Sequence, residues 1–223
     1  MASTQAIKYA PQCGNLTVES IVFNTNNVIG NFSYPPTVPT YKDICKFLQN
    51  CPLKTAFTKC PSVVYQNYLR EFWATAVVQD PNPSTDENTP RPLREFVIKF
   101  TVQNGQTPLT LDFATFTSST GLDYNKGKYV SHPSPEEVKA ELAKIVLNPS
   151  YLDKTPVLKN SFPMAWRILI TFVVQVLGGN YSSTEQINSI QQLITFSLIT
   201  GTEVDIGEII YSDLITKLQN KSR

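Results

Sequence analysis

This sequence is poor in the side chains that most catalytic and metal sites use. It has one histidine and four cysteines in 223 residues, and only 17% of its residues are charged. Soluble domains average about 25% charged residues, so the polar surface here must rely on Asn, Gln, Ser and Thr. Four cysteines in a chain of this length do not form a disulfide scaffold. The sequence therefore has few side chains that could act as a general acid or base in catalysis.

Long apolar and long basic segments are also missing. The run from Ile168 to Leu177 has ten residues and includes Gln175, whereas a bilayer-spanning helix needs about 20. The N-terminus MASTQAIKYAPQC lacks the apolar stretch of a signal peptide. Residues 1–110 hold nine basic against seven acidic side chains, and residues 111–223 hold ten against eleven. We expect a soluble intracellular protein, cytoplasmic or nuclear, with no membrane partner.

The arrangement of prolines predicts an arm followed by one domain. Residues 1–40 end in NFSYPPTVPT, whose prolines favour an extended N-terminal arm with loose packing. Residues 41–220 carry helical patterns and are expected to form a single, mostly helical domain. Within it, residues 80–92 contain four prolines and no large apolar side chain, which predicts an exposed loop. The chain ends just after a helical pattern, so we expect a fragment of a longer reading frame.

Two helices are predicted before the loop. The first begins at Tyr41 and ends at Pro52, and the second follows Ser62, a residue type that caps helices. We expect Arg70 and Glu71 to project away from the apolar face of the second helix. The apolar positions of the two helices are, in order, Ile44, Phe47, Leu48 and Cys51, and Val64, Tyr65, Tyr68, Leu69, Phe72, Trp73 and Ala76.

A β-hairpin is predicted after the loop. Apolar residues alternate from Phe96 to Val102, and Asn104-Gly105 follows, the pair favoured in a type I′ turn. Pro108 on the return strand has no N–H and should lie at a sheet edge. We therefore expect an α+β fold that is mostly α-helical, a helix bundle with one short hairpin at about residues 95–112.

The rest of the chain is predicted to be helical, and each helix has a recognisable signal. A short helix capped by Asp112 should end at Gly121, and the next helix should run from the Ser134–Glu137 capping box to Leu147. An apolar helix from Pro163 to Leu177 should be the central and most buried one. The last two are a helix from the Ser183–Gln186 box to Gly201 and a final helix capped by Asp205, with Ile206, Ile209, Ile210 and Leu214 inward.

Three of the four cysteines lie close together in the sequence. Cys45, Cys51 and Cys60 are spaced as C-x5-C and C-x8-C, whereas zinc ligands usually pair as C-x2-4-C. The single histidine, His132, lies 72 positions beyond Cys60, so a Cys3His site is conceivable but disfavoured. A Cys51–Cys60 disulfide is sterically conceivable, but an intracellular location argues against it. We interpret these cysteines as free, mostly buried thiols, and we expect no metal and no cofactor.

Other polar clusters have simple structural explanations. His132 lies in the predicted loop SHPSP and should be exposed. Glu136, Glu137 and Glu141 lie at a helix start, where the helix dipole favours anions. Trp73 and Trp166 fall on apolar stripes, so core packing is favoured over a binding pocket. The glycines form no phosphate-binding loop.

The order of motifs resembles a known family. The helix with Arg70-Glu71-Phe72-Trp73-Ala74, the hairpin, Thr120-Gly121-Leu122, and the segment Thr200-Gly201 through Ile210 follow one another. This order resembles the uncharacterised domain of putative plant transposon proteins, and especially segments of LTR-retroelement polyproteins from the daisy family. The resemblance covers about residues 41–218 and implies an origin rather than a mechanism. Signatures of a retroelement protease, reverse transcriptase, integrase zinc domain or nucleocapsid knuckle are absent from the sequence.

Two functional hypotheses follow from these observations. The first is a non-catalytic structural or interaction domain of a plant retrotransposon-derived polyprotein, with self-association or binding to other retroelement proteins. The second is a nucleic-acid-binding module of the same element, in which four lysines near the cysteines contact DNA or RNA, although a solvated helix face also explains them. These lysines are Lys42, Lys46, Lys54 and Lys59.

Overall fold

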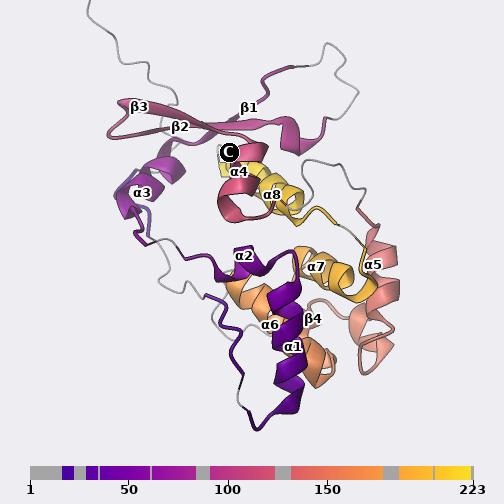
Figure 1. The fold of residues 1–223 in the computed structure, drawn as a ribbon. Helices are drawn as coiled ribbons and strands as arrows, with labels where there is room; N and C mark the ends of the chain where they lie inside the picture. Colours follow the sequence, from indigo (N-terminus) through magenta and orange to yellow (C-terminus); the bar gives the residue numbers. More distant parts are fainter. Residues whose placement is uncertain are drawn as a thin grey trace, which may run out of the picture. The chain divides into compact units, whose positions relative to one another are not determined.

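The computed structural model divides the chain into two units, each assembled from segments that are distant in sequence (Figure 1). Unit 1 consists of residues 1–23, 61–119 and 207–223, and unit 2 consists of residues 24–60 and 120–206. The expectation of one domain over residues 41–220 stays a prediction. The structure describes residues 17–22, 29–34, 36–60, 62–83, 91–123, 132–177, 186–202 and 204–221.

Unit 1 contains a three-stranded antiparallel sheet in the order β1-β2-β3. The strands are β1 (Val77–Gln79), β2 (Val97–Val102) and β3 (Thr107–Leu111). The predicted hairpin is confirmed: the central turn residues Asn104 and Gly105 have φ of 56° and 81°, as a type I′ turn requires. Pro108 lies on β3 at the edge of this sheet, opposite Thr101. Strand β1 was not predicted, because three residues are too few for a visible alternation.

Helices pack against this sheet and against one another in unit 1. Helix α3 (Gln66–Thr75) lies beside β2, and its predicted cap at Ser62 is wrong, since the helix begins after Tyr65 without a side-chain cap. Helix α4 (Phe113–Thr120) begins as predicted, with the Asp112 carboxylate accepting a hydrogen bond from the Thr115 N–H at 2.7 Å. A 3-10 turn, η1 (Leu93–Glu95), precedes β2, and α8 (Ile206–Lys221) follows at the end of the chain.

The core of unit 1 is centred on Tyr211 from α8. This side chain is fully buried, and the rings of Phe113 and Phe116 lie 5.6 and 5.4 Å from its ring, centroid to centroid. Its hydroxyl lies 2.9 Å from the Phe96 carbonyl oxygen and 3.1 Å from that of Leu111. Burial and the nearby Asp112 charge raise the pKa of Tyr211. The remaining fully buried members of this core are Ala76, Ile98, Ile215 and Leu218.

Unit 2 is mostly helical. Its helices are α1 (Pro39–Asn50), α2 (Lys54–Thr58), α5 (Pro135–Leu142), α6 (Met164–Phe172) and α7 (Ser189–Thr200), and a π-helical turn (Val173–Leu177) continues α6. Two 3-10 turns, η2 (Pro149–Asp153) and η3 (Lys159–Ser161), and a two-stranded antiparallel pair, β4 (Val157–Leu158) and β5 (Gln186–Ile187), complete it. The mostly helical α+β class is therefore confirmed for the described residues.

The core of unit 2 consists mostly of aliphatic side chains and also contains phenylalanine rings. Helices α5 and α7 pack together, and α1 lies against α6. Phe32 packs with Phe57 and Phe172, at centroid distances of 6.1 and 5.7 Å. The expected loose packing of residues 1–40 does not hold at Phe32, which is 7% exposed. The main cluster comprises Val138, Leu142, Val146, Leu152, Val157, Phe162, Ile170, Val174, Ile187 and Phe196.

Three expectations about the helices of unit 2 are wrong in detail. Helix α5 has its predicted capping box but ends at Leu142, because the chain tightens into turns and the Leu147 N–H bonds the Ser161 carbonyl. Helix α6 is not the most buried helix; Ile170 is its buried residue, and Met164 is 59% exposed. The box that begins α7 is Asn188–Gln191. Ser183 lies outside the described residues, and Gln186 belongs to β5.

Candidate functional site

The four lysines proposed for nucleic-acid contact are all exposed in unit 2. Lys42 and Lys46 are one turn apart on α1, so they share a face of that helix. Lys54 is the first residue of α2, and Lys59 follows the end of the same helix. The structure thus groups them as two pairs on two helices and leaves the proposal untested.

The cysteines of this region are structural where they are buried. The Cys45 and Cys51 thiols are free and buried, and burial raises the pKa of each. The Cys51 S–H donates to the Leu48 carbonyl at 3.2 Å. A raised pKa keeps a thiol protonated, and the thiolate is the form that attacks electrophiles or binds metal. Two of the three described cysteines are thus buried, in line with the expectation of free, mostly buried thiols, and Cys60 is free and exposed. Cys13 lies outside the described residues.

His132 and the acidic clusters show no catalytic arrangement in the described part of the chain. His132 is exposed, as predicted. Glu137 accepts from the Ser134 N–H at 2.7 Å in the capping box, which lowers its pKa. Glu141 forms an ion pair with Lys144. Among the described residues, no group of three His, Cys, Asp or Glu side chains could hold a metal ion, and no helix is long and apolar enough to cross a bilayer.

The largest departure from the sequence prediction is the apolar stripe of the helix α3 region. Phe72 and Trp73 pack against the core of unit 1, and Ala76 is buried in it. The residues at the start of the same stripe face solvent instead. We name them the α3 apolar face: Val63, Val64, Tyr65, Tyr68 and Leu69, with exposed fractions of 56%, 51%, 64%, 42% and 42%.

Aromatic stacking organises the α3 apolar face. The Tyr65 and Tyr68 rings are stacked, with centroids 5.6 Å apart and an interplanar angle of 26°. The Tyr68 hydroxyl also lies 3.4 Å from the Gln103 side-chain amide on the hairpin turn. Tyrosine side chains give a large contact area at a low cost in conformational entropy, which is why they are common at interfaces.

Part-buried hydrogen bonds of Glu71 and Thr75 fix α3 to the hairpin and so hold this face in place. The Glu71 carboxylate accepts from the backbone N–H groups of Gln103 at 2.8 Å and Asn104 at 2.7 Å. Thr75 bonds both the N–H and the carbonyl of Thr101. The expectation that Glu71 projects away from the packed side is therefore wrong. An interior carboxylate is retained here because it satisfies two turn amides that have no strand partner.

Arg70 does project away from the packed face, as predicted. Its Nε donates to the Ile21 carbonyl at 3.2 Å, and one terminal nitrogen lies 3.4 Å from the Asn67 side-chain oxygen. The sequence from Ser62 to Leu69, SVVYQNYL, carries no charge. The segment that contains the α3 apolar face therefore carries no charged side chain.

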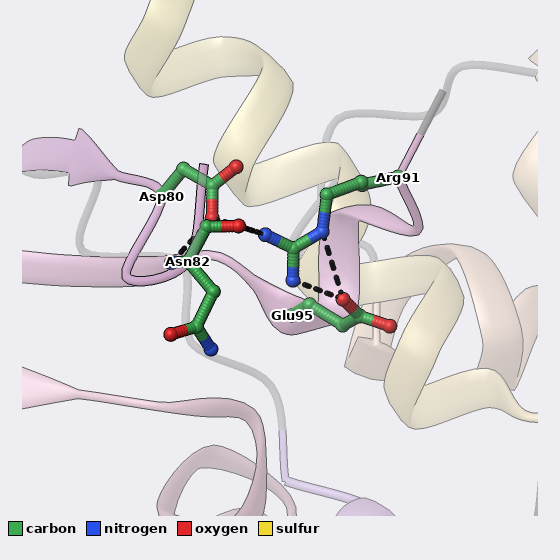
Figure 2. A network of polar contacts seen from close by, with 4 residues as sticks. All are labelled: Asp80, Asn82, Arg91 and Glu95. Atoms are coloured by element: carbon green, nitrogen blue, oxygen red, sulfur yellow. Dashed lines mark hydrogen bonds and ion pairs between the residues drawn. The ribbon is translucent and has the colours of Figure 1, made fainter. Parts of the chain in front are cut away.

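A second polar network in unit 1 joins the flanks of the proline-rich loop. Figure 2 shows the Arg91 guanidinium between the Asp80 and Glu95 carboxylates, with the Asn82 carbonyl as a further acceptor. The Arg91–Asp80 distance is 2.6 Å. The hydrogen bond to Glu95 is the main cause of the raised pKa of Arg91. Residues 84–90 of the predicted loop lie outside the described residues.

An apolar hollow that the sequence did not predict lies between α1 and α7 in unit 2. It has a volume of about 450 Å³. Phe47, which the sequence placed on the inward stripe of α1, is 42% exposed at its edge. Cys51 and Leu53 line it from one side, and Leu198 and Val204 line it from the other.

Comparisons with protein-family models, with curated proteins and with solved structures found no match for this chain.

Proposed function

We propose that this chain is a non-catalytic interaction domain of a plant retrotransposon-derived polyprotein, and that it acts by self-association through the α3 apolar face. The origin rests on the resemblance of its motifs, and the location that goes with it is the cytoplasm or nucleus. One observation carries the interaction role: five neighbouring apolar residues face solvent at the start of a helix that part-buried hydrogen bonds fix to the hairpin.

The neutrality of this face favours a second copy of the chain as the partner. Residues 62–69 contain no charged side chain. Two copies can therefore meet without opposing like charges and without burying an unpaired charge, both of which weaken an interface. Stacked tyrosines are typical anchors in such contacts. Other proteins of the same element are the partners that remain if the chain does not bind itself.

Light scattering across a concentration series tests this proposal. The wild-type chain should gain mass as concentration rises, and the double variant Tyr65→Ser/Leu69→Ser should need about tenfold more protein for the same gain, the effect of losing about 1.4 kcal/mol. The control Tyr41→Ser/Leu147→Ser removes the same two side-chain types at exposed positions of unit 2. A wild-type chain that stays monomeric at high concentration, or an equal effect of the control, excludes self-association through this face.

A second function, nucleic-acid binding, is favoured by the exposure of all four lysines. If Lys42, Lys46, Lys54 and Lys59 each neutralise one phosphate of a single strand, log K should fall with log salt at a slope of about −3. Fluorescence anisotropy with mixed oligonucleotides at low salt measures it. Absence of salt-sensitive binding rules this function out.

A further inference from the structure

Within the part of the chain that the structure describes, the guanidinium of Arg167 on helix α6 has no oxygen acceptor. Its Nε is buried and has no hydrogen-bond partner. One terminal nitrogen reaches only the Met164 sulfur, at 4.0 Å, and sulfur is a weak acceptor. A buried N–H on a charged group that makes no hydrogen bond is costly, and the terminal nitrogens of the same guanidinium are the donors that a ligand can reach.

The other three arginines in the described part of the chain are different. Arg70 donates to the Ile21 carbonyl, Arg91 pairs with two carboxylates, and Arg94 pairs with Glu208 at 3.3 Å. Arg167 thus stands out among them as the arginine without an oxygen partner. A guanidinium presents a planar fork of donors that fits the two oxygens of a carboxylate or phosphate group.

Arg167 lies in an open hollow of unit 2 that contains a second cation and no acid. The hollow has a volume of about 520 Å³, and its lining residues are Lys159, Asn160, Met164, Arg167, Ile168 and Thr171. The Asn160 amide makes no hydrogen bond within the residues that the structure describes, so its N–H₂ can donate to a ligand. Thr171 uses its hydroxyl proton on the Arg167 carbonyl, at 2.7 Å.

The same hollow runs along one side of helix α6, from Met164 to Thr171. The helix begins at Met164, and Pro163 before it supplies no side-chain cap. The first-turn N–H groups point along the helix axis, so the side chains that line the hollow, and not these N–H groups, face a ligand there.

We propose that this hollow is an oxyanion-binding site, in which Arg167 and Lys159 hold a carboxylate or phosphate group. The exposed terminal nitrogens of the Arg167 guanidinium and the Lys159 ammonium would donate to the oxygens of the ligand, because the buried Nε itself has no surface open to the hollow. The exposed Met164 and the neighbouring Ile168 give the site an apolar rim, which suits an oxyanion carried on a larger molecule. This site is separate from the α3 apolar face and does not depend on self-association.

The Nε–H resonances of the arginines in the ¹⁵N-labelled full chain test the site directly. Inorganic phosphate is titrated in one arm and a short glutamate peptide in the other, at constant ionic strength set with chloride. The Arg167 signal, identified by its loss in Arg167→Lys, should shift and saturate, whereas that of Arg70 should stay in place. Saturation in either arm supports the oxyanion site, and the stronger arm identifies the source of the oxyanion.

Two variants sharpen the result. Lys159→Gln should raise the Kd about tenfold, the effect of losing one charge-assisted hydrogen bond. Lys139→Gln removes an equal charge at an exposed position of the same unit, where it pairs with Asp153, and should leave the Kd unchanged. No saturable shift of Arg167 at tens of millimolar of either probe, or equal shifts at Arg70, overturns the proposal. The wild-type titration decides this even if Lys159→Gln does not fold.

Discussion

The two units use different means to fix their elements. In unit 1, part-buried hydrogen bonds join helices to strands: Glu71 and Thr75 tie α3 to the hairpin, and the Tyr211 hydroxyl ties α8 to the ends of β2 and β3. In unit 2, helices meet mainly through apolar side chains, with Phe162 and Leu142 fully buried. The difference follows from sheet geometry, since a hairpin turn leaves backbone amides that need acceptors.

We infer that directional hydrogen bonds set the placement of helices in unit 1, whereas the volume of packed side chains sets it in unit 2. A hydrogen bond is directional, so the polar ties of unit 1 specify where α3 lies and hence where its apolar face points. Apolar packing has no direction, so unit 2 is specified by how well its side chains fill space. The proposed interaction face lies on the unit with the directional ties.

The largest effect is expected from a cavity in unit 2. Phe162→Ala should lower the free energy of unfolding by about 3–5 kcal/mol, because the ring is 1% exposed and its removal leaves a cavity. Urea unfolding followed by Trp166 fluorescence measures this in a Trp73→Phe background, where Trp166 is the only tryptophan. A loss below about 1 kcal/mol contradicts the apolar account of unit 2.

A smaller effect is expected from added volume in the same unit. Gly121 has φ of +79°, and an added Cβ would lie 2.4 Å from the Thr55 side chain. Gly121→Ala should cost about 1–2 kcal/mol for the backbone and about 1–3 more for the collision.

The control for this substitution is Gly201→Ala. Gly201 also has positive φ, +66°, but an added Cβ meets nothing within 4 Å. It should show the backbone cost alone, about 1–2 kcal/mol, in the same urea experiment. Equal losses for the two variants would show that close packing at Thr55 does not matter.

The polar ties of unit 1 are tested by Glu71→Ala. The change removes a charged acceptor from two part-buried hydrogen bonds, so the free energy of unfolding should fall by about 1.5–3 kcal/mol. Trp73 fluorescence in a Trp166→Phe background follows the transition, and amide exchange at Gln103 and Asn104 should accelerate. The exposed acid Glu136 provides the control, and Glu136→Ala should change stability by less than about 0.5 kcal/mol. Unchanged exchange at the turn amides argues against the tie.

The smallest effect is the pH dependence of the helix caps, which both units share. Hydrogen bonds from Thr115 and from Ser134 lower the pKa of Asp112 in unit 1 and of Glu137 in unit 2 below their ordinary values of 3.8 and 4.5. The folded chain therefore binds these protons less readily than the unfolded chain. The caps contribute fully above the ordinary values and are lost as pH falls through the lower folded values.

Urea unfolding between pH 7 and pH 3 checks these caps. Asp112→Asn and Glu137→Gln should each make stability less dependent on pH in this range, because the substituted amides do not titrate. Wild-type and variant curves that stay parallel down to pH 3 would show that neither carboxyl contributes.

The fold was predictable where a short stretch of sequence contains its own explanation. The Asn104-Gly105 turn, the Asp112 cap and the Ser134–Glu137 box each involve residues within a few positions, so their chemistry is visible in the sequence. The shortened α5 and the cap of α7 were not predicted correctly. In α5 the stop depends on a bond from Leu147 to Ser161, fourteen positions away.

The candidate sites were less predictable than the fold. The stripe from Val64 to Ala76 was recognised, but periodicity does not say which part of a stripe has a partner. Glu71 lies within this stripe and is buried, because its carboxylate oxygens accept hydrogen bonds from two backbone N–H groups of the hairpin turn. These groups lie 32 and 33 positions further along the chain. No sequence pattern indicated the hollow at Arg167. A missing hydrogen-bond acceptor can be recognised only when the residues around the guanidinium are known from the tertiary structure.

The sequence by itself determined the mostly helical α+β class, the hairpin with its turn, and the ends of helices at Gly121 and Gly201. These depend on backbone preferences and on bonds between near neighbours. Only the tertiary structure decided that Phe32 is buried, that Tyr65 and Tyr68 face solvent, and that Arg167 lacks an acceptor. Burial and pairing depend on residues brought together from distant parts of the chain, and local patterns do not contain that information.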